Sequence, residues 1–227
     1  MASLGAMRIA ALAALILALS ACSQSTSGQP QPAPGPPPAT STTAAPPSTP
    51  ASPESRLKDR IAWVQAGTEV DPSRYHSAST GTGAAADLKS DIAFISPSGK
   101  ISCITGTAYQ LDGFNCVVKL KNPVPKPHEG FGNWDGGYVN YSAKTLTVGQ
   151  FRGDPGLFIH GDGQTLPYDS KLTFGDYTCR IATDGLTCVN PTTRTGVHMS
   201  DDAIVPFGCL REAQSPPDSS VGRTYTC

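Results

Sequence analysis

The chain has 227 residues, and its 17 Lys and Arg nearly balance its 18 Asp and Glu, leaving a net charge of −1. Charged residues make up 15% of the sequence, below the roughly 25% of an average soluble domain. Proteins that bind nucleic acid usually carry a clustered basic face, so this composition excludes nucleic acid as a partner. Prolines and cysteines are unevenly placed: ten of the 21 prolines lie between Pro30 and Pro53, and six of the seven cysteines lie beyond residue 100.

The first 21 residues have the three parts of a secretory signal peptide. Arg8 supplies a positive charge, an apolar run extends from Ile9 to Leu19, and small residues follow. The run is too short to span a bilayer, which takes about 20 apolar residues. The tetrapeptide Leu19-Ser20-Ala21-Cys22 resembles a bacterial lipobox, whose cysteine is acylated and becomes the first residue of the mature protein. We therefore expect acyl chains such as palmitate on Cys22, which anchor the protein to the cell membrane at its extracytoplasmic face.

A linker follows the lipid site and occupies residues 22–53. From Ser23 to Pro53 there is no charged and no aromatic residue, and proline, serine and threonine predominate. Such a segment buries too little apolar surface to offset its ordering entropy. We expect a disordered, extended spacer that reaches roughly 90 Å. A second interpretation, a spacer with O-linked sugars on the cluster Thr40-Ser41-Thr42-Thr43, stays open.

The remaining residues, 54–227, have the size of one domain. The domain begins with a short helical pattern, in which Leu57, Ile61 and Val64 share one face at positions i, i+4 and i+7. Trp63 lies off the centre of this apolar stripe. The pattern predicts a helix that docks on the domain with the indole at the edge of the contact.

After Asp71-Pro72, short apolar runs alternate with turn signals such as Ser96-Pro97-Ser98-Gly99 and Asp184-Gly185. Many short strands with glycine-rich turns are typical of an antiparallel sandwich or barrel-like fold. We therefore predict a mostly β, disulfide-stapled domain with one short N-terminal helix. The expected strands are 91–95, 100–105, 114–120, 138–141, 145–148, 172–174, 177–181 and 186–190.

Once Cys22 is assigned to the anchor, an even number of cysteines remains, which indicates a disulfide framework in an exported chain. Six thiols allow 15 pairings, so connectivity stays open, and sequential pairing is the simplest scheme. Cys179 and Cys188 give the sharpest local prediction, because a loop over residues 182–185 places them opposite each other at a distance that a disulfide accepts. The six cysteines are Cys103, Cys116, Cys179, Cys188, Cys209 and Cys227.

The sequence contains no recognisable catalytic motif and no metal-ligand spacing among its histidines, so we expect neither cofactor nor metal. The segment from Gly130 to Tyr141 is rich in aromatic residues placed among glycines. These residues either form a binding platform for a glycan or a protein partner or belong to the core of a strand. The aromatic residues are Phe131, Trp134, Tyr138 and Tyr141.

Four motifs occur in a fixed order between about residue 90 and residue 207. Together with the cysteine placement, their order resembles that of a family of actinobacterial, often mycobacterial, envelope lipoproteins and secreted proteins of unknown function. The resemblance implies an extracytoplasmic compartment and a β-rich fold, and it implies no enzyme activity or ligand. The motifs are Phe94-x-Ser96-Pro97-Ser98-Gly99-x-Ile101-x-Cys103, Leu166-Pro167-Tyr168, Cys179 with Gly185-x-x-Cys188-x-Asn190, and Thr195-Gly196-x-x-Met199-Ser200.

These observations lead to three hypotheses about function. The first is a non-enzymatic, lipid-anchored protein of the cell envelope, a binding or structural module whose partner is a wall glycan or another envelope protein. The second is a cell-wall-acting hydrolase or transferase that uses His160, Asp162 and Asp176, which a buried histidine–carboxylate pair beside a nucleophile would favour. The third is an adhesin for a host or partner surface, which a contiguous exposed aromatic patch would favour.

Overall fold

The structure of the protein is a computed structural model. The expected signal peptide, Cys22 and the linker lie outside the residues that it describes. Within the described part of the chain, no helix is both long enough and apolar enough to cross a bilayer. The described residues are 57–107, 110–128, 130–216 and 218–227.

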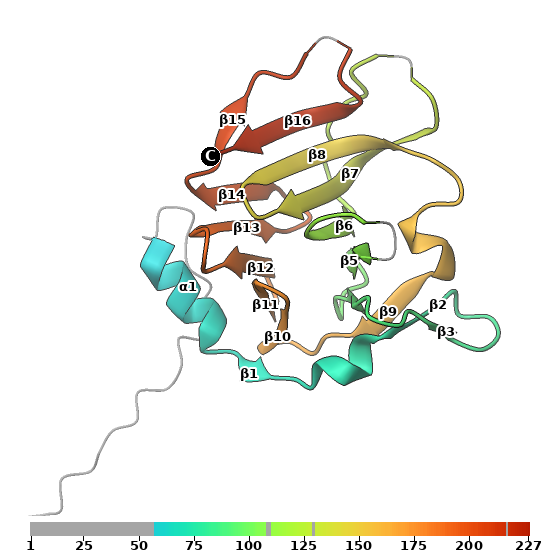
Figure 1. Ribbon diagram of the computed structural model, residues 1–227, viewed down its shortest axis with the longest axis vertical. Helices are drawn as coiled ribbons and strands as arrows, with labels where there is room; N and C mark the ends of the chain where they lie inside the picture. The colour runs from blue at the N-terminus through green and yellow to red at the C-terminus, as the bar shows by residue number, and fades with distance from the viewer. Residues whose placement is uncertain (1–56, 108–109, 129, 217) are drawn as a thin grey trace, which may run out of the picture. The chain divides into compact units, whose positions relative to one another are not determined.

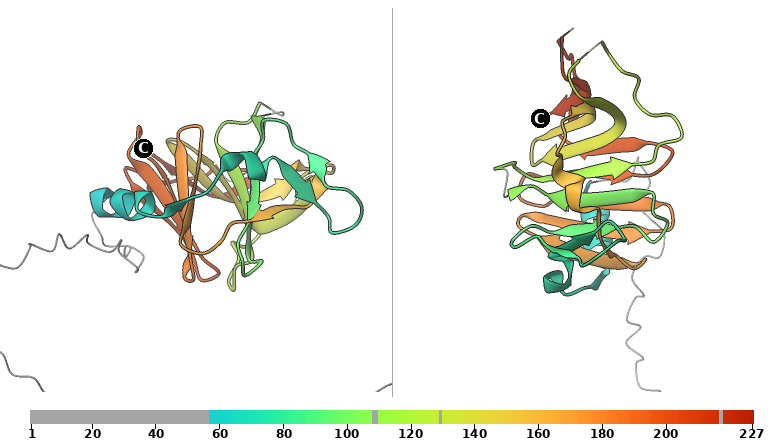
Figure 2. Two further views of the ribbon diagram at one scale, coloured as in Figure 1. Left: turned by 90° about the horizontal axis from the view of Figure 1, so that it is seen from below. Right: turned by 90° about the vertical axis from the view of Figure 1, so that its right-hand side faces the viewer.

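The described strands form two sheets that lie face to face, so the domain is sandwich-like and mostly β, as predicted (Figures 1 and 2). The six-stranded sheet has the order β1 (Thr68–Glu69), β10 (Ser170–Phe174), β11 (Tyr177–Ala182), β12 (Gly185–Asn190), β13 (Thr195–Met199) and β14 (Ile204–Gly208). The ten-stranded sheet has the order β15 (Arg211–Ala213), β16 (Val221–Thr226), β8 (Thr145–Arg152), β7 (Asn133–Ser142), β6 (Phe114–Val118), β5 (Ile101–Thr105), β4 (Ala93–Ile95), β9 (Asp162–Thr165), β2 (Ser77–Ser79) and β3 (Ala86–Asp87).

Neighbouring strands are antiparallel, except that β1 pairs with β10 and β4 with β9 in parallel. The helical segments include α1 (Leu57–Gln65) and the short 3₁₀ helices η1 (Pro72–Tyr75) and η3 (Leu157–His160).

The main core lies between the two sheets, because alternate residues of each strand point inward. Leu186 and Val197 enter it from the six-stranded sheet, and Leu146 from the ten-stranded sheet. At one end of the core the rings of Phe114 and Tyr177 meet edge to face with centroids 5.3 Å apart. Such aromatic pairs add to the free energy gained from burial alone. The core therefore holds the two sheets together as one unit.

Each sheet contains one buried disulfide between directly opposed residues. In the six-stranded sheet, Cys179 pairs with Cys188, and the flanking register places Ile181 opposite Leu186, as the sequence predicts. In the ten-stranded sheet, the bridge between Cys103 and Cys116 joins β5 to β6.

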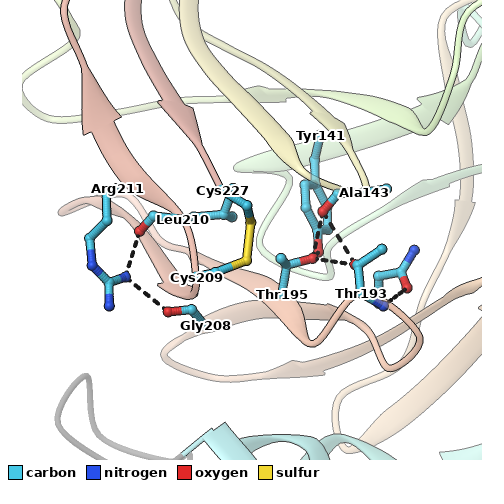
Figure 3. Close-up of a disulfide and its surroundings, with 10 residues drawn as sticks. Tyr141, Ala143, Thr193, Thr195, Gly208, Cys209, Leu210, Arg211 and Cys227 are labelled. Atoms are coloured by element: carbon cyan, nitrogen blue, oxygen red, sulfur yellow. Dashed lines mark hydrogen bonds between the residues drawn. A yellow bond between two sulfur atoms is a disulfide. The ribbon is translucent and has the colours of Figure 1, made fainter.

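The third disulfide joins Cys209 to Cys227 and is exposed (Figure 3). Cys209 lies where the chain leaves β14 of one sheet for β15 of the other. Arg211 braces this crossing, since its Nη1 donates to the carbonyl oxygens of Gly208 and Leu210, each at 2.9 Å. The bridge therefore fixes the place where the chain passes between the sheets.

The helix α1 covers part of the outer face of the six-stranded sheet. The expectation that Trp63 lies at the edge of this contact is wrong, because Trp63 is only 2% exposed. The Arg180 guanidinium lies 4.2 Å from the centre of the indole, and its Nη1 donates to the Trp63 carbonyl oxygen at 2.7 Å. A cation over an aromatic face is attractive, so the indole becomes the centre of the contact.

All eight expected strands are present, and β7 and β8 are longer than expected. Several further strands were not expected, because they lack an apolar run. β9 is an example: a Cβ at Gly163 would overlap the Ala93 backbone, so glycine allows this polar segment to lie close to β4.

Candidate functional site

The aromatic residues on β7 point to opposite faces of the ten-stranded sheet. Tyr141 points into the core, where its Oη lies 2.6 Å from Thr195 Oγ1 of the other sheet. Tyr138 lies three positions earlier and therefore points outward, and its hydroxyl donates to Asn115 Oδ1 at 3.0 Å. Burial raises the pKa of Tyr138 to about 12. These two tyrosines belong to packed regions and do not form an exposed platform.

Phe131 and Trp134 lie in a different environment. Phe131 is 97% exposed, next to Gly132, whose positive φ of 95° glycine adopts without strain. Trp134 is half-buried, and its Nε1 donates to the Val124 carbonyl oxygen at 3.0 Å. Phe131 is therefore the one fully presented ring among the four aromatic candidates.

The candidate catalytic residues of the enzyme hypothesis are not brought together. His160 and Asp162 are exposed at η3 and at the start of β9, whereas Asp176 lies in the turn between β10 and β11. No hydrogen bond or ion pair among the described residues joins them. Within the same residues, no group of three or more His, Cys, Asp or Glu side chains is placed to hold a metal ion.

One hydroxyl–imidazole pair does exist, on the outer face of the six-stranded sheet. Thr187 Oγ1 lies 2.9 Å from His198 Nδ1. Burial lowers the pKa of His198, and the nearby Asp184 carboxylate opposes this shift. Because Thr187 is buried and no carboxylate among the described residues orients the imidazole, the pair does not present a nucleophile to a substrate.

A cavity of about 610 Å³ lies at one end of the sandwich, where residues of both sheets line it; we call it the inter-sheet cavity. Its apolar lining includes Ile92, Leu111 and Phe174, and its polar lining includes Tyr177 and Asn190. This volume falls within the range of small-ligand sites, which combine apolar walls with a few placed polar groups. The inter-sheet cavity is therefore the best candidate for a binding site.

One wall of this cavity is the turn between β7 and β8, which hydrogen bonds fix to the other sheet (Figure 3). The Ala143 N–H donates to Tyr177 Oη at 2.7 Å, and the Ala143 carbonyl oxygen accepts from Thr195 Oγ1 at 2.6 Å. Thr193 continues the network: its Oγ1 lies 2.8 Å from Thr195 Oγ1, and its N–H donates to Asn190 Oδ1 at 3.0 Å. These bonds hold the wall in place before any ligand binds.

A buried carboxylate organises the opposite wall. Asp91 Oδ1 accepts from Thr105 Oγ1 at 2.7 Å and from the Thr107 N–H at 2.8 Å. The Thr105 hydroxyl oxygen accepts in turn from the Ile92 N–H at 2.9 Å. Hydrogen bonds to a charged group are stronger than neutral ones, so this wall is also preformed.

Two further cavities lie near the stretch between Asp135 and Val139, where the pairing of β7 with β8 shifts register. The larger, about 600 Å³, is called the Arg152 cavity; Trp134, Asp135, Arg152 and Phe158 contribute to its lining. Arg152 Nη1 donates to Asp135 Oδ2 at 2.9 Å, and its guanidinium lies 5.5 Å from the centre of the Phe158 ring. The smaller cavity, about 210 Å³, is called the middle cavity, and Tyr138 contributes to its lining.

The sequence motifs pointed to only part of this region. Trp134 and Tyr138 were candidates, whereas Arg152 and Leu111 carried no signal, because neither belongs to an aromatic, catalytic or metal-binding motif. The cavities combine segments that are far apart in the chain, and local spacing does not reveal such a combination.

Comparisons with protein-family models, with curated proteins and with solved structures yield no match for this chain.

Proposed function

We propose that this protein is a lipid-anchored component of the cell envelope, and that its folded domain is a non-enzymatic binding module. The anchor is the acylated Cys22, and the linker of residues 22–53 separates the domain from the membrane. The lipobox, the uncharged linker and the resemblance to envelope lipoproteins support this location.

The inter-sheet cavity is the observation that carries the binding role. Its walls are held by hydrogen bonds among the protein's own groups, around Ala143 on one side and Asp91 on the other. A preformed site loses little conformational entropy when a ligand binds. The enzyme alternative has less support, because His160, Asp162 and Asp176 have no mutual contacts through which they would act together.

The location is tested with the Cys22→Ala variant in the native host. We expect the wild-type protein to enter the detergent-rich phase on partitioning and the variant to remain in the aqueous phase, because acyl chains supply the membrane affinity. Equal partitioning of both proteins into the detergent-rich phase would contradict the anchor.

The binding role is tested by thermal unfolding of the full-length protein with separate glycan, peptide and lipid fractions of the envelope. A ligand that binds only the folded state raises the midpoint of unfolding. Ser90 is exposed and lines the inter-sheet cavity, so Ser90→Trp narrows its mouth. Ser98→Trp adds the same bulk beyond the other end of β4, at a residue that does not line this cavity.

We expect one fraction to raise the midpoint for the wild-type protein and for Ser98→Trp, but not for Ser90→Trp. An equal rise in all three proteins would place binding elsewhere. No rise with any fraction would contradict a binding module.

A further inference from the structure

The inter-sheet, middle and Arg152 cavities have common walls. The inter-sheet and middle cavities share Leu111, while the middle and Arg152 cavities share Arg152, Gly153 and Gly156. The three cavities therefore follow one another, from the end of the sandwich to the part of the ten-stranded sheet formed by β6, β7 and β8.

Leu111 forms only a partial barrier between the inter-sheet and middle cavities. Leu111 is 41% exposed, and it packs close to Gly106, near Leu157. A ligand can pass over such a partly exposed side chain without displacing a packed core residue. We propose that the three cavities act as one trough, and that the trough binds an extended, uncharged glycan chain.

The charge of the lining supports an uncharged ligand. The described lining of the three cavities includes four carboxylates and three cationic groups, so neither sign dominates. Arg152 lines both the middle cavity and the Arg152 cavity, and it already forms an ion pair with Asp135. A polyanion or a polycation would meet charges of its own sign along this path, and like charges oppose binding. The charged residues are Asp112, Lys119, Asp135, Lys144, Arg152, Asp154 and Asp176.

The distribution of polar and aromatic groups points to a sugar rather than an acyl chain. Each cavity offers a half-buried aromatic ring, namely Tyr177, Phe151 and Trp134 in turn. The middle and Arg152 cavities add the amide side chains of Gln150 and Asn133. The C–H face of a sugar ring packs against an aromatic ring, while its hydroxyl edge exchanges hydrogen bonds with amides. An acyl chain would leave those amides without partners, which costs free energy.

This inference rests on the proposed binding function and extends it from one cavity to three. It predicts that affinity grows with the length of the glycan, because a longer chain occupies further parts of the trough. The probes are neutral oligosaccharides released from the envelope polysaccharide of the source cells and separated by size.

The experiment measures the affinity of the full-length protein for these oligosaccharides by titration calorimetry. We expect about tenfold tighter binding for chains of about six sugar units than for chains of about two, because linked contacts act at a high effective concentration. Trp134 supplies a second readout, since only a chain that reaches the Arg152 cavity should change its fluorescence. The Trp134→Phe variant should lose this change.

The Leu111→Trp variant places a larger side chain between the inter-sheet and middle cavities. It should abolish the gain of affinity with length and the fluorescence change, while short chains still bind. Tyr168→Trp is the matched control: Tyr168 is 38% exposed and lines none of the three cavities. This control should behave as the wild-type protein does.

The outcomes separate the trough from the proposed function. If glycans bind with an affinity that does not increase with chain length, the proposal of a binding module stands and the proposal of a continuous trough fails. If only a peptide or lipid fraction binds in the inter-sheet cavity, the glycan proposal fails and the proposal of a binding module stands. If no fraction binds, both proposals fail.

Discussion

The two sheets are covered on their outer faces in different ways. On the six-stranded sheet, α1 buries Trp63 and Arg60, and arginines lie over rings on both sides of the contact, Arg180 over Trp63 and Arg60 over Phe207. On the ten-stranded sheet, η3 and its loop provide part of the cover, and cavities of about 600 and 210 Å³ lie beside it.

The difference shows how the type of cover decides where a protein can bind a ligand. Side chains on a regular helix interleave with those of a sheet and exclude solvent. An irregular loop has no repeating side-chain pattern, so gaps remain between its backbone and the sheet. Ligand sites accordingly tend to lie under loops that a rigid scaffold positions.

The largest expected effect comes from removing Arg180, which packs against α1 on the outer face of the six-stranded sheet. Arg180→Ala should lower the free energy of unfolding by about 3 kcal/mol, because it removes a charged hydrogen bond to the Trp63 carbonyl and the contact with the indole ring. Chemical denaturation followed by circular dichroism measures this change. Arg223→Ala, at an exposed residue of β16, should cost less than about 0.5 kcal/mol. Equal effects would mean that α1 contributes little to closing this face.

A smaller effect is expected at the wall of the inter-sheet cavity. Tyr141→Phe removes the 2.6 Å contact with Thr195 and should lower the free energy of unfolding by about 1.5 kcal/mol. Thr195 keeps its bond to the Ala143 carbonyl, so no buried hydroxyl is left without a partner. Hydrogen exchange of the Ala143 amide should become faster. Unchanged exchange would show that Tyr141 does not help to preform the wall.

On the outer face of the ten-stranded sheet, Leu157→Ala tests how much η3 contributes to the free energy of unfolding. Leu157 is only half-buried, so its truncation should cost about 1 kcal/mol, below the range for a fully buried leucine. The same denaturation measurement applies. A loss as large as that of Arg180→Ala would mean that the two faces are equally well packed.

The smallest expected effect is a pH dependence of the free energy of unfolding that comes from His198, on the outer face of the six-stranded sheet. Burial lowers the pKa of His198, so the unfolded chain binds a proton at pH values where the folded protein does not. The free energy of unfolding should therefore decrease as the pH falls below about 6.5, the ordinary pKa of histidine. His198→Asn should flatten this decrease, and His160→Asn, at an exposed site, should not. Identical slopes in all three proteins would contradict burial of His198.

The hairpin that carries Cys179 and Cys188 shows what could be predicted locally. Its loop length sets which residues face each other, and the distance between opposed residues then permits a disulfide. The burial of Trp63 could not be predicted in this way. It depends on Arg180, which lies 117 residues further along the chain, and the helical stripe does not include this partner.

The candidate site illustrates the same limit. The sequence singled out Trp134 and Tyr138 as aromatic, but did not show that one lines the Arg152 cavity and the other the middle cavity. Phe131 and Tyr141 were equal candidates, yet one is exposed and the other is buried between the sheets.

The amino-acid sequence by itself determined the eight apolar strands, the turns between them and the hairpin disulfide, because alternation and loop length act between residues close together in the chain. The tertiary structure alone decided which face α1 closes, which aromatic rings are buried and where the three cavities lie. Cavities depend on how segments such as the loop of Leu111 and the strand end at Arg152 meet. That meeting follows from the order of the strands within the ten-stranded sheet and from the loops that join them, rather than from any local spacing.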